Sequence, residues 1–147
     1  PVQVVLWHVI GGEERAQDFA MDVRRADRAP QSYNAIGDGM ALGIALIEGC
    51  GCSPTRKVID VSGDNPDRRS NIPSTVARNA AVKAGITVNA LAILNDNRTG
   101  PSGQPWLVEV YQQEVIGGPG AFVIPAQTRA DFDRALRQKL IQEIAIR

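Results

Sequence analysis

A chain of 147 residues is long enough to form one domain with a buried core. Its sixteen basic residues balance sixteen acidic ones, which argues against a basic surface for nucleic acid. No apolar run approaches the roughly 20 residues that a membrane-spanning helix needs, so we expect no membrane span.

The first third of the chain predicts one strand followed by two helices. Residues 2–10 are rich in β-branched and aromatic side chains, which is typical of a strand. Apolar residues recur at helical spacing over residues 13–26. After a break at residues 30–33, Asn34 is placed to cap a second helix, which runs to about residue 48 and is apolar nearly all round.

Two cysteines, Cys50 and Cys52, follow the second helix in a predicted loop. A disulfide across a single intervening residue would be strained, given the usual separation of the two Cα atoms. Zinc needs four ligands, and two cysteines supply only half of them. We therefore expect two free thiols.

The rest of the chain alternates strands with helices, which is typical of a three-layer α/β fold with a mostly parallel, Rossmann-like sheet. About four strands are expected in all, which is few for such a sheet. The predicted elements are a strand at 57–61, a helix at 73–84, a strand at 86–94 covered on both faces, a short helix at 106–115, a strand at 121–125, and a last helix after the capping pair Thr128 and Asp131.

Polar side chains follow two of these strands. Asp64 and Asn65 come just after the strand at 57–61, and residues 95–97 (Asn, Asp, Asn) come just after the strand at 86–94. Asn34 and Asp38 begin a helix that could open on the same edge of the sheet. Ligands of open α/β sheets gather at the carboxyl ends of the strands, and Mg²⁺ or Ca²⁺ prefers oxygen ligands of this kind. The same residue types are also common in turns and caps, so a metal site and a set of turn residues both remain open.

Three further features invite an enzymatic interpretation. Asp60 lies in the middle of a predicted buried strand, where a carboxylate must be paired or hydrogen-bonded, and we favour a structural role for it. His8 is the only histidine, and a triad with Ser62 would lack the G-x-S-x-G elbow of serine hydrolases. The glycines of residues 37–43 do not directly follow a strand, so they predict close helix packing and not a dinucleotide loop.

Four stretches in order carry a family resemblance: "RKVIDVSGDNPDRRSN", "ARNAAVKAGITVNALAILND", "VIGGPGAFV" and "FDRALRQKLIQEIA". Together they resemble a bacterial family of unknown function with a von Willebrand factor A-like fold, from about Val4 to Ala145. The resemblance implies an exported protein, periplasmic or secreted. It also implies a metal-ion-dependent adhesion site, at which Mg²⁺ or another divalent cation bridges to an acidic group of a protein partner. By that resemblance Asp64 matches the aspartate of the third ligand loop, and Asn34 lies where a threonine is usual in the second.

The resemblance further implies that part of the fold lies outside this sequence. The first ligand loop, D-x-S-x-S, occurs nowhere in the 147 residues, and residues 2–10 match the third of six strands ordered 3-2-1-4-5-6. We therefore expect residues 1–147 to be the C-terminal portion of a single domain, strands 3 to 6 and their helices, incomplete at the N-terminus. Such a fragment should expose apolar strand edges, to be covered by the missing N-terminal segment or by a second copy of the chain. Cation binding by this chain alone should be weak or absent.

The leading hypothesis is a non-catalytic protein-binding or adhesion-type module. Its binding edge is formed by Asn34, Asp38, Asp64, Asn65 and Asp67. One alternative is a metal-dependent hydrolase that uses Asp60 and Asp64. The other is a structural domain that has lost metal binding, which the asparagine at position 34 slightly favours.

Overall fold

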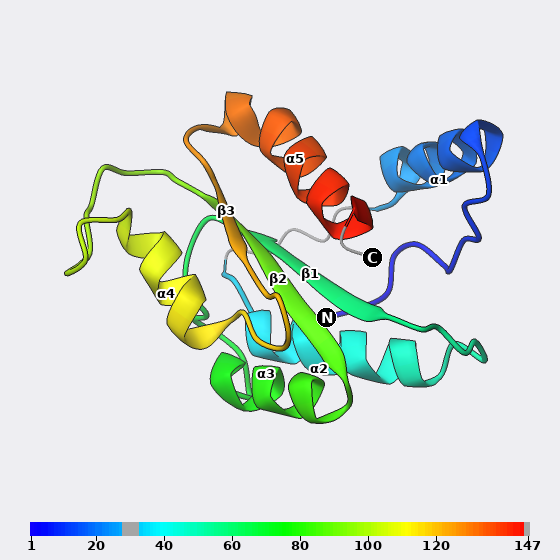
Figure 1. The fold of residues 1–147 in the computed structure, drawn as a ribbon, viewed down its shortest axis with the longest axis horizontal. Coiled ribbons are helices and arrows are strands. Elements are labelled where there is room, and N and C mark those ends of the chain that lie inside the picture. The colour runs from blue at the N-terminus through cyan, green and yellow to red at the C-terminus, as the bar shows by residue number, and fades with distance from the viewer. Residues whose placement is uncertain (28–32, 146–147) are drawn as a thin grey trace. The chain divides into compact units, whose positions relative to one another are not determined.

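The computed structural model describes residues 1–27 and 33–145 (Figure 1). The chain divides into two compact units, Pro1–Ser32 and Tyr33–Arg147. Most of the predicted break at residues 30–33 lies outside the described residues. Within the described ranges, every helix is too short or too polar to cross a bilayer.

The first unit contains helix α1, Glu13–Arg25, as its periodicity predicts. Two glutamates begin the helix and two arginines end it, which complements the helix dipole. The strand expected at residues 2–10 is not formed, and this prediction was wrong. A strand needs a neighbour to receive its backbone hydrogen bonds, and none of residues 1–27 supplies one. The apolar side chains of this segment are therefore exposed, up to 90% for Val9.

The second unit is built on a parallel sheet of three strands in the order β1-β2-β3. The strands are β1 Lys57–Gly63, β2 Ile86–Ile93 and β3 Val123–Ala126. The helices are α2 Ile36–Glu48, α3 Ser74–Lys83, α4 Trp106–Glu114 and α5 Phe132–Ala145, the last preceded by a 3₁₀ turn, Arg129–Asp131. The backbone N–H of Asp131 donates to the Thr128 hydroxyl at 3.2 Å, so the predicted capping pair is confirmed.

Each face of this sheet carries its own apolar core. Side chains from α2, α3 and α4 pack against one face in a core that includes Met40, Val88 and Tyr111. Helix α5 covers the other face, where Ala135 and Leu136 pack with Leu91. In Figure 1 α2 and α3 lie below the sheet and α5 lies above it. The expected α/β class with a parallel, Rossmann-like sheet is thereby confirmed.

Helix α2 packs closely on its neighbours through glycine, as its sequence predicts. A Cβ atom at Gly37 would collide with the carbonyl oxygen of Ile72, and one at Gly43 would lie 3.2 Å from the Ile59 side chain. The helix begins at Ile36 with Ala35 as its N-cap and has no side-chain cap. The predicted capping role of Asn34 was therefore wrong, because this side chain points to a different loop.

Strand β1 lies at an edge of the sheet, since among the described residues only β2 pairs with it. This position changes the environment of Asp60, which we expected to be buried. Its side chain is 37% exposed, so burial in the middle of the strand was wrong. Its ion pair with Lys139 agrees with the structural role expected of Asp60.

Cys50 and Cys52 form a disulfide, so the expectation of two free thiols was wrong. The residue between them is Gly51, which adopts a φ of 65° that other residues rarely accept. This turn brings the two Cα atoms to 5.2 Å, within the usual range for a disulfide. A glycine at the central position thus allows a disulfide that the spacing of the cysteines alone does not predict.

Candidate functional site

Asp64 stands at the carboxyl end of β1, where loops from distant parts of the second unit converge. The Asn65 amide donates to the Asp64 carboxylate at 3.2 Å, and the Asn95 amide donates to the Asp64 carbonyl at 3.4 Å. The carbonyl of Asn65 accepts from the Asn34 amide and from the Tyr111 hydroxyl, both at 2.9 Å. The structure therefore brings the predicted residues Asn34, Asp64 and Asn65 together.

The Asp64 carboxylate is held in its ionised form. Partial burial opposes ionisation, but hydrogen bonds from asparagine amides outweigh it and keep the pKa of Asp64 below its ordinary value. These amides belong to Asn95, Asn65 and Asn34. The site is thus a single carboxylate surrounded by amide donors that reach it from three loops.

Asp38 and Asp67 fasten the loop of residues 64–73 to the start of α2. The Asp67 carboxylate accepts from the Gly37 N–H at 3.1 Å and from the Ser70 N–H at 3.2 Å. In return, the Asp38 carboxylate accepts from the backbone N–H groups of Ile72 and Asn71, each at 3.0 Å, and these bonds lower its pKa. The carboxylates of both predicted residues therefore hold this loop, which follows the carboxyl end of β1.

Amide side chains contact Asp64 in the described part of the chain. Among the described residues, no three His, Cys, Asp or Glu side chains gather in a group that could hold a metal ion. The amides of Asn65 and Asn95 direct their nitrogen atoms, not their oxygens, toward Asp64. This arrangement satisfies the carboxylate as a free anion, and a cation would require the amides to turn over.

Basic and aromatic side chains flank the same loops. The backbone N–H groups of Arg68 and Arg69 both donate to the Asn34 carbonyl, at 2.9 and 3.2 Å, which fixes this arginine pair beside Asn34. Both arginines are exposed, and the Arg69 guanidinium lies 4.4 Å from the centre of the Tyr33 ring. A positively charged flank therefore adjoins Asp64.

A groove of about 380 Å³ runs from these loops along the open edge of β1. Its walls come from α2 and β1 and are mixed in character, with Met40 and Ile59 among the apolar members and Asn34 and Ser62 among the polar ones. The groove begins beside Asn34, so the carboxyl end of β1 and its open edge form one continuous surface.

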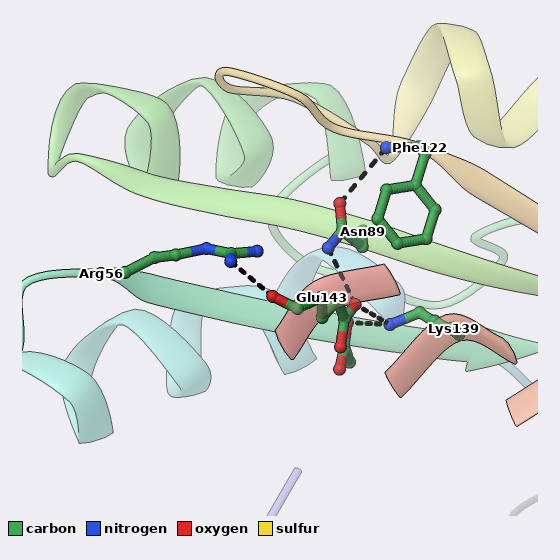
Figure 2. Close-up of polar contacts among 6 residues, drawn as sticks. Arg56, Asn89, Phe122, Lys139 and Glu143 are labelled. Atoms are coloured by element: carbon green, nitrogen blue, oxygen red, sulfur yellow. Dashed lines mark hydrogen bonds and ion pairs between the residues drawn. The ribbon is translucent and has the colours of Figure 1, made fainter. Parts of the chain in front are cut away.

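A second polar cluster lies under α5, and the sequence did not predict it. Figure 2 shows Lys139 and Glu143 projecting from α5 toward Asn89 on β2. Lys139 is fully buried and forms ion pairs with Asp60 and, at 2.6 Å, with Glu143. The Asn89 amide donates to Glu143 at 2.8 Å, and its oxygen accepts from the Phe122 N–H at 3.2 Å. These bonds satisfy the two buried polar side chains Asn89 and Lys139.

Asp60 titrates unusually within this cluster. Desolvation and the neighbouring Glu143 carboxyl raise the pKa of Asp60 to about 6, against the opposing attraction of Lys139. The pKa of Glu143 is lowered in turn, because Asp60, Lys139 and Asn89 donate to its carboxylate and outweigh its burial. Two carboxyl groups thus share one ammonium group, and one of the two protonates readily.

Asp60 and Asp64 belong to separate networks. Asp60 is bonded to Lys139 on the face covered by α5, whereas Asp64 is bonded to asparagine amides at the end of the strand.

His8, in the first unit, forms a contact of 3.1 Å with Asp22 and packs edge-on against Phe19. This environment agrees with the interpretation of His8 as a packed residue.

Comparison with known proteins gives one family. No curated protein and no solved structure matches this chain. All of its residues, 1–147, match a family described as a protein of unknown function, DUF1194. Because the match spans the entire sequence, the chain belongs to the DUF1194 family.

Proposed function

We propose that this chain is a non-catalytic protein-binding module of von Willebrand factor A-like type, whose binding edge is the carboxyl end of β1. The observation that carries the proposal is the convergence of loops on Asp64, fixed by hydrogen bonds of Asn34, Asn65 and Tyr111. Loops fastened in this way bind with little loss of conformational entropy, which favours recognition.

The partner presents an acidic group. Two modes of contact with it are chemically distinct. A divalent cation at Asp64 would bridge to the partner carboxylate, as the resemblance implies. Without a cation, Asp64 repels that group, and the exposed Arg68 and Arg69 supply the attraction. The amide nitrogens that face Asp64 favour the second mode for this chain.

Calorimetry with Mg²⁺ and Mn²⁺ tests the first mode. We expect no saturable heat at micromolar affinity, because Asp64 has amide donors and not further carboxylates around it. Asp64→Asn is the matched control, since it removes the charge and keeps the size. Micromolar binding that this variant abolishes would show that the cation-bridged mode operates.

Binding of a labelled poly-glutamate peptide tests the second mode. Arg69→Glu should weaken it at least about tenfold, because the substitution reverses a charge at the edge. Arg137→Glu makes the same change at an exposed position of α5 and should leave binding unchanged. If poly-glutamate binds no more tightly than a neutral peptide of equal length, recognition of an acidic group is excluded.

A further inference from the structure

The turn between α2 and β1 carries a chemical group that the binding edge does not use. It contains the Cys50–Cys52 disulfide and precedes β1, so it lies at the opposite end of that strand from Asp64. Residues 51–56 are all exposed, Cys52 among them, whereas Cys50 is partly buried. We propose that this disulfide is redox-active and oxidises an exposed dithiol of another protein.

The disulfide adds little to the stability of the fold. The constraint that a disulfide places on the unfolded chain grows with the length of the loop it closes, and this loop encloses only Gly51. Neither cysteine belongs to the two apolar cores. Exposed disulfides exchange readily with thiols. The Cys50–Cys52 bond is of this kind, and its loop constrains the chain very little.

The two sulfur atoms are not equivalent. The backbone N–H of Cys52 donates to Cys50 Sγ at 3.2 Å, which would stabilise negative charge on that sulfur. Cys52 is the more exposed of the pair. An incoming thiolate therefore attacks Cys52 Sγ, and Cys50 is the leaving group.

The exchange proceeds in two balanced steps. A thiolate of the partner dithiol bonds to Cys52 Sγ, the Cys50–Cys52 bond breaks, and its electron pair stays on Cys50, which then takes up a proton. The second partner thiolate attacks the partner's own sulfur in the mixed disulfide, and Cys52 leaves as a thiolate that is protonated in turn. The partner loses two electrons and two protons and becomes a disulfide, and the chain gains both and carries two thiols.

Equilibration with glutathione tests whether the bond is labile. The oxidised protein is incubated in a glutathione buffer of cytosolic ratio, quenched with acid, alkylated and weighed by intact mass spectrometry. More than half of the chains should carry two alkyl groups, because a labile disulfide is more oxidising than that buffer. A population that stays oxidised overturns the proposal. The second measurement compares the thermal unfolding of the oxidised and the reduced protein. If the reduced protein is unfolded, the disulfide is structural, and this result also overturns the proposal.

A reduced synthetic peptide with a Cys-x-x-Cys sequence serves as the dithiol probe. The wild-type chain should oxidise about one equivalent of the peptide, as the two-step exchange requires. Cys50→Ser and Cys52→Ser should oxidise none. Acid quenching during reduction by glutathione should trap the adduct on Cys52, as tandem mass spectrometry would show. An adduct found mainly on Cys50 would overturn the assigned direction of attack, and an unoxidised peptide would overturn the activity.

Discussion

Lys139 lies in an environment unusual for its chemical type, because an ammonium group with no exposure needs compensating charge. Asp60 and Glu143 provide it from β1 and from the next turn of α5. Removing one partner of a buried ion pair usually costs more than the pair contributes, since the remaining charges are left without compensation.

Lys139→Met should therefore lower the free energy of unfolding by about 2–4 kcal/mol, a range reduced from that of fully buried pairs because Asp60 is partly exposed. Chemical denaturation with urea would measure the loss. Lys83→Met, at an exposed position of α3, is the control and should change stability little. Adding Glu143→Gln to Lys139→Met should restore part of the loss. Equal stability of the two methionine variants would contradict the burial of the charge.

At the scale of the element, α5 is held on the sheet by this cluster together with a small apolar core. A carboxyl whose pKa is higher in the folded than in the unfolded state binds its proton more tightly when folded. Protonation of Asp60 therefore stabilises the folded state at low pH, and this stabilisation is lost as the pH rises through about 6. Ionisation of Glu143 has the opposite effect on stability, because its pKa is lowered from 4.5 in the folded state. Its contribution is therefore lost at low pH, as the carboxylate becomes protonated.

The free energy of unfolding of the wild type, relative to that of Asp60→Asn, should thus fall between about pH 4 and about pH 7. We expect a fall of about 1 kcal/mol, because solvent screens a side chain that is 37% exposed. Urea unfolding at steps across this range would measure it. Asp133→Asn, also on α5 but exposed, should run parallel to the wild type. Parallel profiles for Asp60→Asn and the wild type would refute the raised pKa.

The elements that the sequence predicted are those determined by local pattern. Helix α1 follows from its apolar spacing, and β2 from a nearly continuous apolar run. The strand at residues 2–10 failed although its local pattern is strong, because a strand also requires a partner that sequence periodicity does not reveal. The position of β1 at the edge of the sheet was also not visible in the sequence, whose pattern suggested a buried strand.

The candidate site was predictable in place but not in detail. Ligands of open parallel sheets bind at the carboxyl ends of the strands, and Asp64 and Asn65 do follow directly on the end of β1 at Gly63. The contact of Asn34 with Asn65 spans 31 positions of sequence and that of Lys139 with Asp60 spans 79, so no local pattern encodes them. The available signal for the second cluster was Asn89, a lone polar residue within an apolar strand.

At the scale of the whole molecule, two surfaces lack partners among the described residues. Strand β1 pairs only with β2 in the described part of the chain, so its other edge is open beside a groove lined partly by Ile59 and Val61. Residues 2–10 expose a run of β-branched and aromatic side chains. Open edges and exposed segments of high β-propensity are the features through which proteins associate with one another.

We therefore expect the purified chain to self-associate, with a sedimentation coefficient that rises with concentration. Ser62→Lys should reduce this association, because it places a charge on the exposed edge of β1, and edge lysines prevent strands from pairing. Leu6→Lys tests the contribution of residues 2–10 in the same way, since Leu6 is 77% exposed. Gln112→Lys adds the same charge at an exposed position of α4 and separates the effect of place from that of net charge. A wild type that sediments as a monomer at every concentration would contradict the expected self-association. Loss of association in Ser62→Lys but not in Leu6→Lys would assign the contact to β1 alone.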